Sequence, residues 1–86
     1  MLKISTIEST EELAKIRIDG QISGEGVKLL QNTCKAQLKK GLKLTVDLQN
    51  VSFVDRDGIA VLRKLEQRNV EFLNASLFIT GQIRKA

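Results

Sequence analysis

The sequence of 86 residues predicts one α/β domain built on a mixed sheet. Two observations lead to this fold class. Apolar and polar residues alternate with a period of two in several short segments, as they do in strands with one buried face. Between these segments, apolar residues recur at helical spacing, so the predicted order is strand, strand, helix, strand, helix, strand and the start of another helix. We expect this single domain to span residues 1–86.

Residues 2–7 and 13–18 are predicted to form the first two strands. In the second, Ala14, Ile16 and Ile18 alternate with charged residues. The polar segment ESTEE between the two runs has the length of a hairpin loop. The first pair of strands is therefore expected to be antiparallel.

The first helix is predicted to run from an N-cap at Ser23 to about Lys40. Gly41 follows a basic last turn, which suits both the helix macrodipole and a left-handed C-terminal cap. The apolar stripe of this helix consists of Val27, Leu30, Cys34 and Leu38. Because the one cysteine falls on this stripe, we expect a buried hydrophobic group rather than a reactive thiol.

A third strand is predicted over residues 42–48, and a second helix begins near Arg56. Asn74 is the expected stop of that helix, and residues 75–80, ASLFIT, are predicted as the fourth strand. The strands alternate instead of being continuously apolar, so the predicted sheet of about four strands should be covered by helices mainly on one face. The apolar positions of the second helix are Ile59, Leu62, Leu65 and Leu73.

The composition excludes several classes of function. The chain has no histidine and one cysteine, which rules out a Cys/His zinc site and every His-based nucleophile pair. We therefore expect no enzyme, no cofactor and no metal. The net charge is only +4 and there is no Trp or Tyr, so nucleic acid is not an expected partner. No signal peptide and no membrane-spanning run is present, which predicts a cytoplasmic protein without stable membrane insertion.

Two minor alternatives stay open at this point. An enzyme would need a magnesium site, which Asp47, Asp55 and Asp57 would form if they converged. A lipid-headgroup surface, or a docking surface for an acidic partner, would need a basic open face on the sheet. The residues expected on that face are Lys3, Ser5, Lys15, Arg17, Lys43 and Thr45, and ordinary solvated strand positions explain them as well.

A charged junction, SFVDRDGIAVL at residues 52–62, leads into the second helix. Asp55 is its expected N-cap, which puts Asp57 beside the unpaired N–H groups of the first turn. Arg56 stands at the unfavourable end of the macrodipole. Gly58 is about 1 kcal/mol worse than Ala in a helix, so we expect a neighbouring backbone or a partner to approach it closely.

The run LTVDLQNVSFVDRDGIAVLRKL resembles the core of the STAS domain, named for sulphate transporters and anti-sigma factor antagonists. In that family a buried strand ends in Asp, and a hydrophobic-Asp-Ser-Ser/Thr-Gly junction opens a helix with Gly-Leu-x-x-Leu. The segment RIDGQIS is also similar to the family's strand-Gly segment, so the resemblance extends over residues 2–80 and implies a STAS-like fold. The junction residues that match are Asp47, Phe53, Val54, Asp55, Gly58, Ile59 and Leu62.

This resemblance implies a non-catalytic regulatory module that binds a protein, as an anti-sigma factor antagonist binds an anti-sigma-factor kinase or a related regulatory ATPase. The alternative is an accessory subunit of a phospholipid-transport ABC transporter that docks on the ATPase. The family's phosphorylated pair is replaced by Arg56-Asp57, so no hydroxyl remains there. The partner-binding residues expected on the junction and the following helix are Phe53, Asp55, Arg56, Asp57, Gly58, Arg63 and Lys64.

Three interpretations of the Arg56-Asp57 pair compete. Asp57 could stand in for a phosphorylated residue, the pair could bind a partner without switching, or both residues could only cap the helix and face solvent. Ser52 is the nearest hydroxyl and lies outside the motif.

The C-terminal helix is expected to be short or truncated, because little more than one turn remains before Ala86. If that end is natural, apolar surface near Leu77, Ile79 and Ile83 would be exposed. Such a surface would favour a homodimer or a partner's helix.

Overall fold

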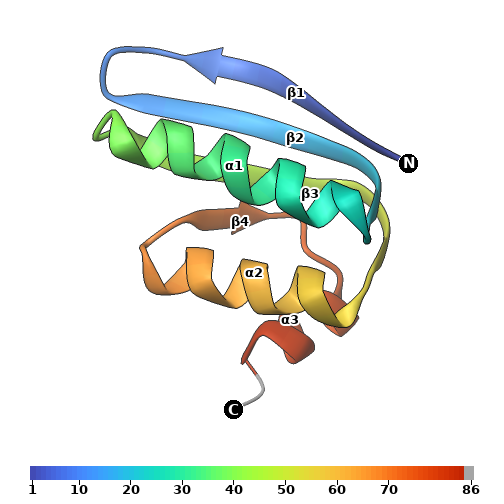
Figure 1. The fold of residues 1–86 in the computed structure, drawn as a ribbon. Coiled ribbons are helices and arrows are strands. Elements are labelled where there is room, and N and C mark those ends of the chain that lie inside the picture. Colours follow the sequence, from blue (N-terminus) through green and yellow to red (C-terminus); the bar gives the residue numbers. More distant parts are fainter. Residues whose placement is uncertain (85–86) are drawn as a thin grey trace.

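The structure is a computed structural model that describes residues 1–84. It confirms the predicted mixed sheet, with the strand order β1-β2-β3-β4 (Figure 1). β1 is antiparallel to β2, whereas β3 is parallel to both of its neighbours. Along the chain the elements are β1 (Leu2–Ser9), β2 (Leu13–Ile22), α1 (Glu25–Lys39), β3 (Lys43–Val54), α2 (Arg56–Gln67), β4 (Glu71–Leu73) and α3 (Leu77–Arg84).

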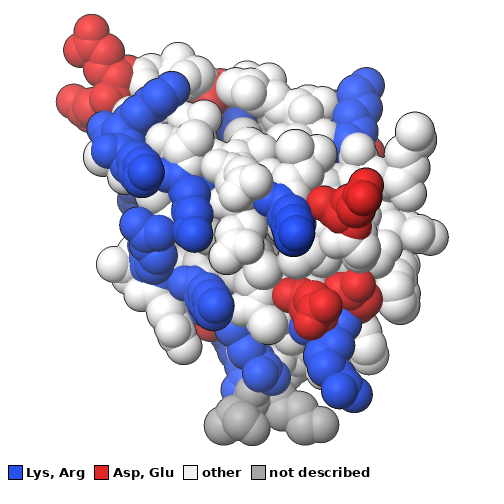
Figure 2. Space-filling model, in the orientation of Figure 1, with Lys and Arg blue, Asp and Glu red and all other residues white. Residues whose placement is uncertain are grey.

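The helices of the described chain lie on one face of the sheet, as the alternating strands predicted (Figure 1). α1 connects β2 to β3 and α2 connects β3 to β4. Crossovers between parallel strands are right-handed, so consecutive crossovers in one direction place their helices on the same side. α1 and α2 consequently run side by side in the same direction, and α3 packs against α2. Lys and Arg side chains gather at the end of the helical side where α1 and α2 finish (Figure 2).

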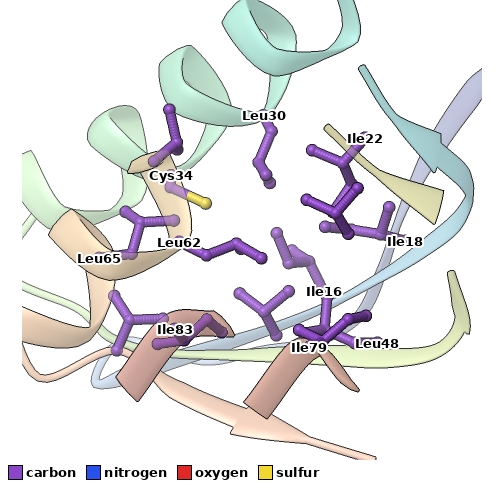
Figure 3. Close-up of a cluster of buried hydrophobic side chains, with 14 of the residues drawn as sticks. Ile16, Ile18, Ile22, Leu30, Cys34, Leu48, Leu62, Leu65, Ile79 and Ile83 are labelled. Atoms are coloured by element: carbon purple, nitrogen blue, oxygen red, sulfur yellow. The ribbon is translucent and has the colours of Figure 1, made fainter. Parts of the chain in front are cut away.

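The core fills the space between this face of the sheet and the helices (Figure 3). The inward positions of β2 and β3 alternate with polar residues, which confirms the period of two in the sequence. Burial raises the pKa of Cys34 to about 12, so the thiol stays protonated and packs as a small hydrophobic group, as expected. The largest fully buried side chains are Ile16, Ile18, Ile22, Leu30, Leu44, Leu48 and Leu62.

The prediction for the C-terminal quarter was wrong in two places. α2 ends at Gln67, because Asn69 takes a left-handed conformation with φ 67° and turns the chain toward the sheet. The strand that follows is β4, not residues 75–80. Residues 75–80 instead lead into α3, whose N-terminus is fixed by the hydroxyl of Ser76 accepting the N–H of Ile79 at 3.1 Å.

The start of α1 also differs from the prediction. Gly24, not Ser23, is the N-cap, and its φ of 55° lies in the left-handed region that favours glycine. No side chain of its own segment caps this helix. The amide of Gly24 instead donates to a carboxylate from the start of α2, which the local sequence pattern could not indicate.

Candidate functional site

Asp55 fixes the geometry of the charged junction. It is the N-cap of α2, as predicted, and its Oδ1 accepts the N–H of Gly58 at 2.7 Å. Its Oδ2 accepts the N–H of Gly24 at 3.1 Å, and its own N–H donates to the carbonyl of Ile22 at 3.0 Å. One carboxylate therefore joins the N-termini of α1 and α2 to the end of β2, where both helix dipoles favour a negative charge.

Gly58 is buried where α2 meets β2 and β3. A Cβ at this position would lie 2.7 Å from Cγ1 of Val54 and 2.8 Å from the carbonyl oxygen of Ile22. The expectation of close approach by a neighbouring backbone is thus confirmed, and the glycine is needed for packing within the chain. The surface of the junction is formed by the residues beside it.

Arg56 and Asp57 are exposed in the first turn of α2, on the rim that Asp55 holds in place. Neither side chain makes a hydrogen bond or ion pair with another residue in the described part of the chain. Phe53, just before the junction, has 53% of its surface exposed, and Lys64 is exposed two turns further along α2. Four of the seven residues predicted to bind a partner therefore lie at the surface.

Arg63 has a different environment from the other predicted residues. It is half-buried, and its guanidinium donates to the carbonyl of Gln82 at 2.7 Å from Nη2 and 3.1 Å from Nε. Nε also lies 3.2 Å from the carbonyl oxygen of Ile83. These bonds satisfy carbonyl groups in the last turn of α3, so the immediate contacts of Arg63 hold α3 against α2.

An apolar rim beside the junction was missed by sequence reasoning. A groove of about 270 Å³ lies between the start of α2 and α3, and Phe78 forms one wall of it opposite Arg56 and Ala60. Phe78 is 67% exposed and its neighbour Leu77 is 92% exposed. A helix assignment for this segment would have found them, since Ile79 and Ile83 are four residues apart and must share the buried side.

The expected apolar surface for a homodimer is corrected by the same helix. Ile79 and Ile83 are buried in the core, and only Leu77 of the three predicted residues is exposed. Helical geometry explains the outcome, because positions that a strand would place on alternate faces fall on one face of α3.

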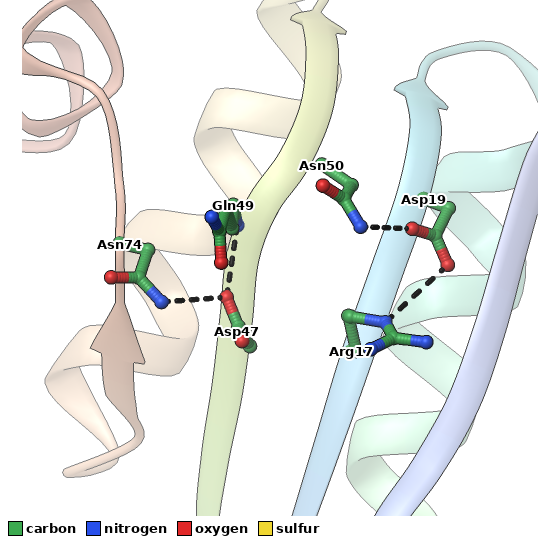
Figure 4. Close-up of polar contacts among 6 residues, drawn as sticks. All are labelled: Arg17, Asp19, Asp47, Gln49, Asn50 and Asn74. Atoms are coloured by element: carbon green, nitrogen blue, oxygen red, sulfur yellow. Dashed lines mark hydrogen bonds and ion pairs between the residues drawn. The ribbon is translucent and has the colours of Figure 1, made fainter.

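The open face of the sheet carries charges of both signs, so the expected basic surface is wrong. The strand register places Arg17 beside Asp47, Lys3 beside Asp19 and Thr45 beside Glu71. Figure 4 shows two polar clusters there: Asn74 donates to Asp47 at 3.1 Å, and Asn50 donates to Asp19 at 2.7 Å. The N–H of Gln49, followed by the Asn74 amide, lowers the pKa of Asp47 below its usual 3.8. Such a balanced face does not favour anionic lipid.

The magnesium alternative is also contradicted. Among residues 1–84 no three acidic or thiol side chains come close enough to hold a metal ion. Asp47 is engaged on the open face of the sheet, whereas Asp55 binds helix amides. In the same part of the chain, no helix is long and apolar enough to cross a membrane.

Comparisons with known proteins agree with this geometry. The family model of the STAS domain matches residues 5–80. Among solved structures, the chain is similar to the anti-sigma factor antagonist SpoIIAA in its unphosphorylated form, with a TM-score of 0.69 at 20% sequence identity. The match covers 91% of this chain and 78% of that one. A comparison with curated proteins found no match.

Proposed function

This chain belongs to the STAS domain family, and on that premise we propose that it is a non-catalytic regulatory module that binds a protein partner through the start of α2. The observation that carries the proposal is the exposure of Arg56 and Asp57 on a junction whose backbone Asp55 anchors. A charged pair held on two helix N-termini presents a fixed geometry to a partner, at little cost in conformational entropy.

The surroundings of the pair support a binding surface of ordinary composition. Exposed aromatic groups flank it, with Phe53 before the junction and Phe78 across the groove. Aromatic and arginine side chains are enriched among residues that dominate binding energy, and charges around them set the choice of partner. The proposed contact residues are Phe53, Arg56, Asp57, Lys64 and Phe78. Asp55 and Gly58 shape the junction, and Arg63 acts through α3.

The module binds without a phosphorylation switch at the junction. The residues between Asp55 and Gly58 have no hydroxyl, and a carboxylate at Asp57 carries at most one charge where a phosphate carries nearly two. Arg56 beside it offsets that charge. We therefore favour constitutive binding over permanent mimicry of a phosphorylated state.

The partner proposed is an anti-sigma-factor kinase or a related regulatory ATPase of the cytoplasm. The motif match at the junction supports this class, and the solved structure with the same fold is titled an anti-sigma factor antagonist. An ABC transporter ATPase is the other partner that the family allows, and the experiment below separates the two.

The test is a pull-down with the tagged chain from a lysate of the native cells, with the bound proteins identified by mass spectrometry. Arg56→Ala with Asp57→Ala is the test variant, and Lys3→Ala with Lys15→Ala on the opposite face is the matched control. We expect a kinase or regulatory ATPase that the test variant loses and the control retains. Equal affinity of the purified partner for both variants would refute the junction as the contact.

Phosphorylation gives a second test with the same partner. Incubated with the purified kinase and ATP, the native chain is expected to remain unmodified between residues 55 and 58. Arg56→Ser with Asp57→Ser restores the hydroxyls and is expected to become a substrate. Phosphate on Ser52 of the native chain would contradict the proposal that switching is absent.

A further inference from the structure

Basic side chains form a continuous column over the C-terminal ends of α1 and α2, at the far end of the helical side from the junction (Figure 2). In residues 31–40 and 62–68 the one acidic residue is Glu66, and it lines a separate hollow between α2, β4 and α3. We call the exposed cations of these segments the cationic ridge; its residues are Lys35, Lys39, Lys40, Lys64 and Arg68.

Helical geometry places the ridge on the surface shared by the two helices. At 100° per residue, Lys64 and Arg68 lie on one flank of α2, while Arg63 lies on the flank that contacts α3. The flank with Lys64 is therefore turned away from α3 and toward α1. Lys35 and Lys39, one turn apart, stand on one flank of α1.

The macrodipoles explain only part of this arrangement. Cations are favourable in the last turn of a helix, which accounts for Lys39 and Lys64 one by one. The side-chain ion pair found within residues 1–84 joins Arg17 to Asp19 on the open face of the sheet, so the ridge has no acidic partner within the described chain. Like charges gathered on one surface repel each other, and an anionic surface docked on them would relieve that repulsion.

The charge pattern along α2 favours a protein over a membrane or a nucleic acid. Asp55 and Asp57 stand at its start and the ridge at its end, so the sign of the surface reverses over about 18 Å. A uniformly anionic bilayer would face both ends, and the ridge has no apolar side chain to insert. It also lacks an aromatic group for stacking on bases. A protein surface can match such a reversal.

We propose that the cationic ridge is a docking surface for the acidic surface of a protein partner. The inference does not depend on the proposed role of the junction, since it rests on different residues. It predicts association that is steered by charge and weakened by salt, because exposed charges are screened beyond about 10 Å at 0.1 M salt.

The experiment uses poly-glutamate as the probe and follows the backbone amide shifts of the whole chain by NMR. Shifts are expected at residues of the ridge, with binding that weakens as salt is added. Lys35→Glu with Lys39→Glu should reduce the affinity at least about tenfold. Lys3→Glu with Lys15→Glu, which makes the same change in net charge on the open face of the sheet, should change it less than about twofold.

Further arms keep the outcome unambiguous. Lys35→Gln with Lys39→Gln avoids an acidic residue at a helix C-terminus and should give an intermediate loss in a chain that remains folded. Arg56→Ala with Asp57→Ala should leave poly-glutamate binding unchanged, which separates this proposal from the function of the junction. Equal losses in the ridge and open-face variants would overturn the proposal. So would vesicles of phosphatidylserine and phosphatidylcholine that bind the ridge more tightly than poly-glutamate does.

Discussion

The carboxylate of Asp55 and the backbone N–H of Gly24, 31 positions apart, are joined by a hydrogen bond of 3.1 Å. The same carboxylate caps α2 through the N–H of Gly58. A single side chain thus closes the N-termini of both crossover helices. The spatial relation of α1 and α2 depends on it, and so does the position of Arg56 and Asp57.

Replacing Asp55 by Ala is expected to destabilise the fold by about 2 kcal/mol, because a helix cap and a second hydrogen bond are lost together. Asp55→Asn should recover only part of this, since its amide group offers one acceptor oxygen to two N–H donors. Urea denaturation measures the free energy of unfolding. Asp57→Ala is the control and should change it by less than about 0.5 kcal/mol; equal effects at the two positions would contradict the role assigned to Asp55.

Gly58→Ala is expected to destabilise by about 1–3 kcal/mol, although Ala is the better helix former. The added Cβ would be 2.8 Å from the Ile22 carbonyl oxygen, and that backbone belongs to the edge of the buried core. The matched control is Gly81→Ala in α3, where a Cβ would meet nothing within 4 Å. That substitution should stabilise by up to about 1 kcal/mol. Thermal unfolding of the two variants should therefore shift in opposite directions.

The fold was predictable from sequence wherever a segment showed one clear period. β2 and β3 alternate over many residues, and their register makes one face apolar, so the mixed sheet with helices on one side could be inferred. The C-terminal segment is short and its apolar residues fit either period. There Asn69 and Ser76 decide the structure through a left-handed turn and an N-cap, and the alternation of Val70 and Phe72 was the available signal for β4.

The candidate site was predictable only in its local part. The cap at Asp55 follows from its place before an apolar repeat, and the poor helix propensity of Gly58 indicated close packing. The bond to Gly24 and the position of Phe78 across the groove arise from contacts between segments distant in sequence. No local pattern encodes such contacts.

Stability should fall in acid in part through Asp47. The N–H of Gln49 and the Asn74 amide hold its pKa below 3.8 in the folded chain. A carboxyl group whose pKa is lowered on folding stabilises the protein above its unfolded value, and this contribution is lost as the pH falls through the folded pKa. The difference in unfolding free energy between the native chain and Asp47→Asn should therefore be largest at neutral pH and shrink below 3.8. An NMR titration of Asn74→Ala should show the carboxyl pKa rising toward 3.8; an unchanged midpoint would exclude the contribution of Asn74.

Arg63→Ala is expected to loosen α3 and to destabilise the protein by about 1–3 kcal/mol, because half-buried carbonyl groups of Gln82 and Ile83 lose a charged donor. Hydrogen exchange should show the loss of protection concentrated in α3, while β2 and β3 exchange as before. Lys64→Ala is the control, since that side chain is exposed and should leave exchange in α3 unchanged. If Arg63→Ala weakens partner binding only together with this opening of α3, its effect passes through Phe78 and the groove. A loss of binding with α3 fully protected would show that Arg63 touches the partner itself.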